Sequence, residues 1–179
     1  MKLSTLITEL HGRHEFGAVL LYFEFPQLKI VQDIIKPEDV YEDPSIDGGG
    51  IEEYPHVTLL YGLHDGVSTE QIKEVIDNIN FGACKINNPS LFENEDTDVL
   101  KYDVSGQGLY EANNELRKLP YTSDFPEYHP HLTIAYLKPK TGKRYTIALQ
   151  GQSFTIPPKY AVYSKTDGSK EKLEINTKI

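Results

Sequence analysis

The chain has 179 residues, and 18 Lys and Arg against 27 Asp and Glu give it a formal net charge of −9. This length predicts one domain with a full hydrophobic core. The acidic balance argues against binding to long nucleic acid, whose affinity comes largely from Lys and Arg, but not against a small anionic substrate in a local pocket. The single cysteine, Cys84, excludes an internal disulfide and a multi-cysteine metal site and fits a reducing compartment.

No targeting segment is visible at the amino terminus. The first apolar stretch is too short for a signal peptide and meets Glu9 early. No apolar run approaches the ~18 residues of a membrane span. We therefore expect a soluble, cytoplasmic protein.

The first part of the chain alternates between strand and helix patterns. Residues 1–15 are expected to form a short helix or arm, 17–25 a buried strand ending at Pro26, 28–35 a helix stopped by Pro37, and 37–53 an acidic, glycine-rich linker loop. Residues 54–61 form a strand after a proline. Ser68 begins the next helix, with Gln71 completing a capping box and Ile72, Val75, Ile76 and Ile79 facing the core.

The second part continues in the same way. Strands are expected near 83–86, 90–93 and 99–104, followed by a helix over 107–119 with Leu109, Ala112, Leu116 and Leu119 inward. A loop over 120–130 leads to strands over 131–137 and 145–149. A hairpin joins 160–163 to 172–175 through a turn at Asp167-Gly168. Together these elements predict an α+β chain in one domain, residues 1–179.

Two seven-residue segments repeat each other. Residues 55–61 read Pro-His-Val-Thr-Leu-Leu-Tyr, and residues 130–136 read Pro-His-Leu-Thr-Ile-Ala-Tyr. Pro, His, Thr and Tyr recur at the same offsets, and the two histidines are 75 residues apart (131 − 56). The repeat predicts two similar lobes related by an approximate two-fold.

The spacing within each copy brings polar side chains together. Side chains at i and i+2 share a strand face, so His56 projects with Thr58 and His131 with Thr133. The residues between them face the opposite side and can pack on helices: Val57, Leu59, Leu132 and Ile134. Two central strands, one per lobe, then place two His and two Thr in one cleft.

This set of side chains suits phosphodiester chemistry. One imidazole can take a proton from an attacking hydroxyl while the other gives one to the leaving oxygen. The threonine hydroxyls can donate to the non-bridging phosphoryl oxygens, and nothing in the scheme needs a metal. A single His-x-Thr is usually incidental, but two copies with matching Pro and Tyr argue against chance.

Paired His-x-Thr motifs on apolar strands in an α+β chain of this length resemble the two-histidine (2H) phosphoesterase superfamily, which includes LigT-like proteins. The segments 55–63 and 131–137, with the ending 163–168 (Tyr-Ser-Lys-Thr-Asp-Gly), look like the phage anti-CBASS phosphodiesterases. The resemblance spans about residues 17–176. It implies a two-lobed fold with antiparallel sheets around a central cleft and helices outside. It also implies metal-independent hydrolysis of cyclic di- and trinucleotide messengers such as cGAMP, by which a phage silences a bacterial defence.

Further candidates surround the two motifs. Tyr22 and Tyr128 could stack on a nucleobase, and Lys138 and Lys165 could offset substrate charge. Tyr61 and Tyr136 lie at odd offsets from the histidines, so we expect them to face away into the core. The remaining histidines, His11, His14 and His64, are expected at the surface.

Three alternatives stay open. His129 with His131 could ligate a metal, but such a site needs a third ligand that no pattern supplies, so we expect no metal and no cofactor. The same fold could serve an RNA 2′,3′-cyclic phosphodiesterase or a 2′-5′ ligase-like enzyme, which the acidic charge disfavours. A non-catalytic cyclic-nucleotide-binding protein is disfavoured by the intact acid–base pair. We expect a monomer that binds neither long nucleic acid nor a membrane.

Overall fold

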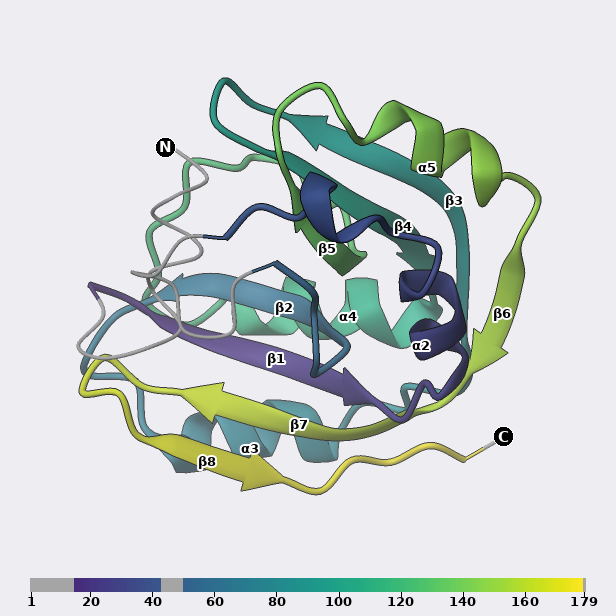
Figure 1. Ribbon diagram of the computed structural model, residues 1–179. Helices are drawn as coiled ribbons and strands as arrows, with labels where there is room; N and C mark the ends of the chain where they lie inside the picture. The colour runs from purple at the N-terminus through teal and green to yellow at the C-terminus, as the bar shows by residue number, and fades with distance from the viewer. Residues whose placement is uncertain (1–14, 43–49, 179) are drawn as a thin grey trace.

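The computed structural model describes residues 15–42 and 50–178, and its core is a curled antiparallel sheet of eight strands (Figure 1). The strand order is β6-β3-β4-β5-β2-β1-β7-β8. The strands are β1 (Gly17–Phe23), β2 (His56–Leu63), β3 (Cys84–Glu93), β4 (Asp98–Ser105), β5 (His131–Leu137), β6 (Ser153–Ile156), β7 (Pro158–Ser164) and β8 (Lys170–Leu173). The helices are α2 (Gln27–Gln32), α3 (Thr69–Asp77), α4 (Gln107–Leu116) and α5 (Lys143–Ala148), with a 3₁₀ turn at Pro37–Asp39.

The sheet consists of two halves that meet at its centre. β2 and β5 pair through Val57 and Leu132, and from this seam the order runs outward as β2-β1-β7-β8 on one side and β5-β4-β3-β6 on the other. The helices follow the same symmetry, because α2 follows β1 and packs on β5 while α4 follows β4 and packs on β2. The expected two-lobed α+β fold is confirmed, with one continuous sheet in place of two.

One face of the sheet is apolar and carries the helices. The motif residues expected to face inward are fully buried: Val57, Leu59, Leu132 and Ile134. Figure 1 shows α3 and α4 on the same side, behind β1, β2 and β7. The capping box of α3 forms as expected, because the Gln71 amide donates to Ser68 Oγ and the Ser68 amide donates to the Gln71 side chain. The helices therefore occupy the outer side of the sheet and leave the other face for the His-x-Thr side chains.

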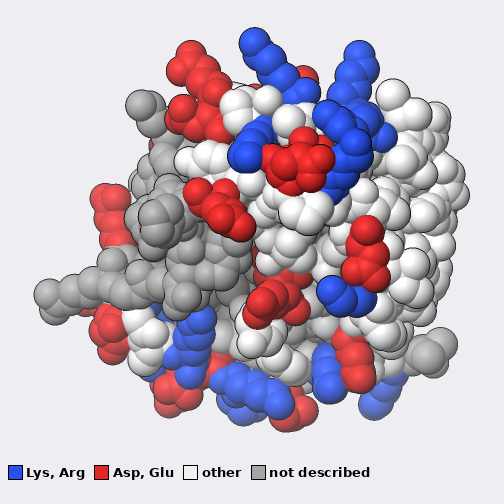
Figure 2. Space-filling model, in the orientation of Figure 1, with Lys and Arg blue, Asp and Glu red and all other residues white. Residues whose placement is uncertain are grey.

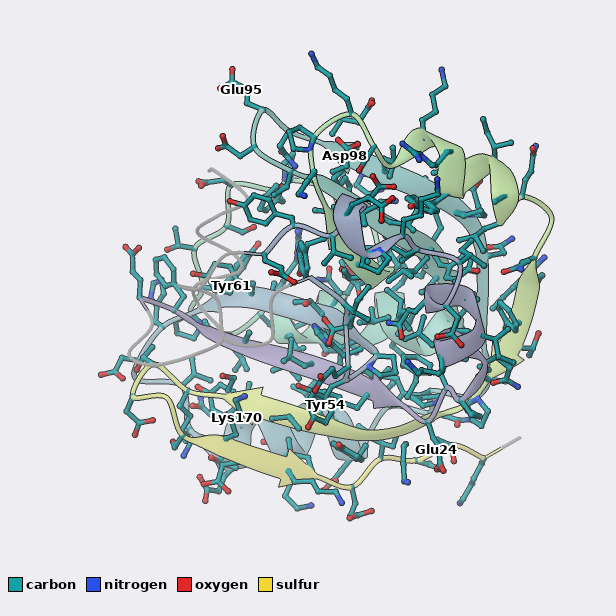
Figure 3. All side chains as sticks on the ribbon, viewed as in Figure 1. Glu24, Tyr54, Tyr61, Glu95, Asp98 and Lys170 are labelled. Atoms are coloured by element: carbon teal, nitrogen blue, oxygen red, sulfur yellow. The ribbon has the colours of Figure 1, made fainter. Side chains whose placement is uncertain are left out.

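The strand expected over 145–149 is wrong, because residues 145–148 lie in α5 and Leu149 caps its carboxyl end. Their β-branched and aromatic side chains favour a strand, yet Tyr145 and Leu149 are buried four residues apart while Ile147 is 64% exposed, which is helical periodicity. The buried Asp98 carboxylate accepts the Gly142 N–H at 2.9 Å at the start of this helix (Figure 3). A tertiary contact from β4 thus overrides the local strand preference.

The segment expected as a linker over 37–53 is attached to β5 where the structure describes it. The Tyr41 amide donates to the Tyr136 carbonyl at 3.0 Å, and the Tyr136 amide donates to the Gly50 carbonyl at 2.6 Å. Asp39 is buried and accepts a hydrogen bond from the Tyr145 hydroxyl. The described residues of the segment form a loop as expected, with one 3₁₀ turn, but both ends of this loop are bonded to β5 and do not run free as a linker would. Residues 43–49 lie outside the described residues, and so do residues 1–14 of the arm expected over 1–15, with His11 and His14.

Smaller differences concern element ends. α2 ends at Gln32, short of Pro37, and leaves Ile30 and Ile34 exposed. α4 ends at Leu116, short of the expected 119. The strands expected near 83–86 and 90–93 form one strand, β3, because an irregularity between Asn87 and Pro89 accommodates the proline within the ladder. β6 was not expected from the sequence. In the described part of the chain, no helix is long and apolar enough to cross a bilayer.

Candidate active site

The two His-x-Thr motifs meet where the halves of the sheet join. Val57 and Leu132 are antiparallel partners, so one step along each strand sets His56 opposite Thr133 and Thr58 opposite His131. Their side chains are half-exposed, whereas Val57 and Leu132 are buried on the opposite face. We call the side that carries these four residues the His-Thr face. The structure thus brings together all four residues that the sequence predicts as catalytic.

Each histidine ring is held in the same way. His56 Nδ1 lies 2.8 Å from the Tyr54 carbonyl, and His131 Nδ1 lies 2.9 Å from the His129 carbonyl. Because a carbonyl only accepts, Nδ1 carries the proton in both rings. The neutral form of each ring then has its lone pair on Nε2, which is free of this bond and can exchange a proton with substrate.

A β-bulge follows the threonine in each motif. The register against the neighbouring strand shifts by one residue at Leu59 in β2 and at Ile134 in β5. The extra residue restores Tyr61 and Tyr136 to the His-Thr face, where both are half-buried. A hydrogen bond joins Tyr136 to Thr133, and burial raises the Tyr136 pKa to about 12. The expectation that both tyrosines face away into the core is therefore wrong, since it assumed regular strands.

Buried amide side chains from α4 and α2 hold the bulges. Asn113 Nδ2 donates to the Leu59 carbonyl at 2.7 Å, and Gln32 Nε2 donates to the Ile134 carbonyl at 3.1 Å. Both bonded carbonyls belong to the bulged residue, the third after the motif histidine. Each half of the molecule therefore shapes the motif of the other half, because α4 follows β4 but anchors β2, and α2 follows β1 but anchors β5.

The neighbours of His56 are apolar and aromatic. On β1, Leu20 pairs with Thr58 and Tyr22 pairs with His56, and the Tyr22 ring centroid lies 5.3 Å from that of His56. Tyr160 on β7 stacks on the other side of Tyr22 at 5.3 Å and 18°. Burial, with Glu52 and Tyr160 nearby, raises the Tyr22 pKa to about 12, so its hydroxyl stays protonated at neutral pH. The sequence predicts Tyr22 as a candidate for stacking on a base but does not indicate its neighbour Tyr160.

The neighbours of His131 are charged. At the positions equivalent to Leu20 and Tyr22, β4 carries Lys101, which pairs with Thr133, and Asp103, which pairs with His131. Lys101 is buried, and its ammonium lies 2.9 Å from the Asp103 carboxylate and 2.7 Å from Ser90 Oγ. Sequence reasoning missed both charged residues. Their alternation along 99–104 is visible, but only the register of β4 on β5 sets them beside the second motif.

Phe92 completes this half of the site. Its ring meets His131 edge-on at 4.9 Å, and the Lys101 ammonium lies 4.5 Å from its centroid. Burial lowers the His131 pKa below its ordinary value, and the charge of Lys101 adds to this effect, against an opposing hydrogen bond to the His129 carbonyl. Although burial alone would raise it, hydrogen bonds from Lys101 and Asn88 hold the Asp103 pKa below its ordinary value. At neutral pH the site therefore pairs a fixed ammonium with a carboxylate beside an imidazole that favours the neutral form.

The other three predicted binding residues make contacts that do not involve the side chains of His56, Thr58, His131 or Thr133. The Tyr128 hydroxyl donates to the Thr58 carbonyl at 3.0 Å, and its ring packs on Tyr110 of α4, so Tyr128 supports β2 from the helix side. Lys138 donates to the Glu38 carbonyl and fixes the 3₁₀ turn. Lys165 lies beyond the end of β7, 3.5 Å from Glu171. These contacts favour structural roles for all three residues.

The alternative metal site receives no support from the arrangement of its ligands. His129 is exposed and pairs with Glu127 at 3.2 Å. Within residues 15–42 and 50–178, no three His, Cys, Asp or Glu side chains cluster as a metal site. The residues that line one cavity include Asp65, Ser68 and Lys165, and those that line another include Lys29, Gln32 and Glu53. Neither lining includes His56 or His131.

Comparison with known proteins bears on the fold. No protein-family model and no curated protein matches the sequence. The PDE domain of MHV ns2 is similar in structure, with a TM-score of 0.57 and 15% identity over 89% of this chain and 99% of that one. Usb1 from Kluyveromyces marxianus has a TM-score of 0.54 and 10% identity over 90% and 98%, and its structure with uridine monophosphate gives 0.55 and 11%. The chain therefore has the two-lobed 2H phosphoesterase fold.

Proposed function

We propose that this chain is a phosphodiesterase in which His56 and His131 act as an acid–base pair. The observation that carries the proposal is the antiparallel pairing of Val57 with Leu132, which sets two Nδ1-anchored imidazoles and two threonines on one face. An acid–base pair needs two such groups on opposite sides of one reacting phosphorus. Binding alone would not require a matched pair.

The proposed reaction opens a 3′-5′ phosphodiester bond. One neutral imidazole takes the proton of the ribose 2′-hydroxyl, whose oxygen attacks phosphorus in line with the 5′ oxygen. The phosphorus–O5′ bond breaks, and the other, protonated imidazole gives its proton to the leaving oxygen. Thr58 and Thr133 donate hydrogen bonds to the non-bridging oxygens, which carry the developing charge. The immediate product is a linear nucleotide with a 2′,3′-cyclic phosphate.

The proposed substrate is a cyclic di- or trinucleotide. Tyr22 and Tyr160 form an aromatic platform beside His56 on which a base could stack. Acidic side chains are interspersed with Lys and Arg on the face in Figure 2, even over α5 where basic residues gather, and the net charge is −9. Such a surface suits a small anionic ligand better than a long polyanion. In a phage-infected cell, we propose that the enzyme works in the host cytoplasm against a cyclic-nucleotide defence signal.

An RNA-end enzyme is the second candidate function. It is favoured by the structural similarity to Usb1, which was solved with uridine monophosphate. A 2′,3′-cyclic phosphate or 2′-5′ linkage at an RNA end presents the same phosphoryl chemistry to the two histidines. The acidic charge argues against a substrate with a long RNA body.

The experiment is a substrate panel in excess EDTA. The protein is incubated with cyclic di- and trinucleotides and with RNA ending in a 2′,3′-cyclic phosphate, and products are identified by mass spectrometry. We expect cleavage of a cyclic oligonucleotide that persists in chelator and is lost in His56→Ala and in His131→Ala. Cleavage of the RNA end alone would select the second candidate. Tight binding of a cyclic nucleotide without turnover would refute the enzymatic proposal.

A further inference from the structure

The two halves of the site have equivalent backbone geometry but differ in the side chains beside each histidine. Equivalent bulges, equivalent amide anchors and equivalent Nδ1 bonds make the surroundings of His56 and His131 alike up to the neighbouring strand. At that strand the equivalence ends. Leu20 stands beside Thr58 where Lys101 stands beside Thr133. Any difference in the work of the two histidines must therefore come from such non-equivalent neighbours.

We propose that Lys101 is a positioning residue that divides the labour, so that His131 is the general base and His56 the general acid. This inference rests on the proposed function and adds to it the assignment of roles. Lys101 is held in place by three contacts: an ion pair with Asp103 at 2.9 Å, a hydrogen bond to Ser90 at 2.7 Å, and the face of Phe92 at 4.5 Å. The Phe92 ring in turn packs against His131.

A fixed ammonium beside one imidazole opposes a second positive charge there. The charged and titratable groups that face His131 are Lys101 and Asp103 from β4 and His56 from β2. The imidazole of His129, two residues before His131, pairs with Glu127 instead. Lys101 and His56 both disfavour the imidazolium form of His131, and Asp103 opposes them. The ammonium of Lys101 therefore disfavours a proton on His131 when the pair shares one. In the proposed assignment, the neutral His131 accepts a proton and His56 donates one.

The test uses two substitutions with opposite expected signs. Lys101→Met removes the ammonium and should shift the His131 titration to higher pH by about one unit, the size expected for a nearby like charge in a partly buried site. Asp103→Asn removes the opposing carboxylate and should shift the titration to lower pH. Lys101→Arg keeps the charge and should restore the native value. Lys85→Met, an exposed lysine on β3, changes the net charge equally and should shift neither histidine.

Two readouts separate this inference from the proposed function. Nuclear magnetic resonance of the imidazole protons in the free protein gives both histidine titrations without any substrate. The pH profile of kcat/KM then shows which limb moves: a base must be neutral, so its titration sets the acidic limb. We expect Lys101→Met to move the acidic limb upward and to leave the alkaline limb in place.

Each result has a definite meaning. An unchanged His131 titration in both Lys101→Met and Asp103→Asn would overturn the inference, whether or not the protein cleaves a phosphodiester. Movement of the alkaline limb would also overturn it, because His131 would then be the acid. If the titrations shift as expected but no substrate is cleaved, the electrostatic part stands and the proposed function fails. Should Lys101→Met not fold, the sign of the Asp103→Asn shift decides the question.

Discussion

Removal of the Asn113 amide tests whether the bulge in β2 shapes the candidate active site. Asn113 lies on α4, is 3% exposed, and donates to the Leu59 carbonyl at 2.7 Å. Asn113→Leu keeps the size of the side chain but leaves that carbonyl without this donor. A buried polar group that loses its partner costs about 1–3 kcal/mol, so we expect the free energy of unfolding to fall by that amount.

The same substitution should also lower turnover. The Leu59 bulge follows directly on Thr58 and fixes the register of β2, the strand that carries His56. Stability is measured by urea denaturation followed by far-ultraviolet circular dichroism, with an unchanged m-value as the sign that only stability has changed. Asn114→Leu is the matched control: it places the same residue one position later on the exposed side of the helix and should stay within about 0.5 kcal/mol of the parent chain. If Asn113→Leu unfolds and turns over like Asn114→Leu, the bulge does not depend on this amide and the reasoning fails.

Three further predictions concern the chemistry. His56→Ala and His131→Ala should each lose about 10²–10⁴-fold in kcat while still binding substrate by calorimetry, and the double variant should be little slower than either, since the two groups act as a unit; additive losses would contradict a shared step. A substrate whose 2′-hydroxyl is replaced by hydrogen should not be cleaved at that linkage, and its full hydrolysis would show that water is the nucleophile. Tyr22→Ala should weaken substrate binding by about 5- to 150-fold, the worth of one stacked base, whereas Tyr110→Ala on the helix side should not; equal effects would argue against the platform.

The placement of the four His and Thr side chains on one face could be predicted because it depends on local geometry. His56 and Thr58 are two residues apart on a short strand, and so are His131 and Thr133, so strand alternation alone puts each pair on one face. The repeat then indicated that the two pairs belong together. Strand alternation gave the wrong face for Tyr61 and Tyr136, which follow the bulges. The bulges that return these tyrosines to the His-Thr face are anchored by amides from the opposite half of the molecule, which no local pattern reveals.

The charged half of the site could not be predicted for a related reason. Lys101 and Asp103 lie about thirty residues before the motif they serve, and their role depends on which strand pairs with β5 and in which register. The helix at 143–148 could not be predicted because the residue before it, Gly142, is held by the distant Asp98 of β4. The sequence pattern therefore predicted single elements and their repeats. It did not predict features that depend on contacts between two elements far apart in the sequence.

The order of the strands has a consequence for how the protein is made. The half that carries His131 comes from one continuous stretch, residues 84–156, whereas the half that carries His56 is split between residues 17–63 and 158–173. During synthesis β1 therefore presents an open edge until β7, nearly a hundred residues downstream of β2, reaches it. Non-local pairings of this kind form slowly, because the intervening chain must close first. Tyr160 lies on β7 and cannot contact Tyr22 until that strand is synthesised. A nascent chain can therefore complete the surroundings of His131 before those of His56.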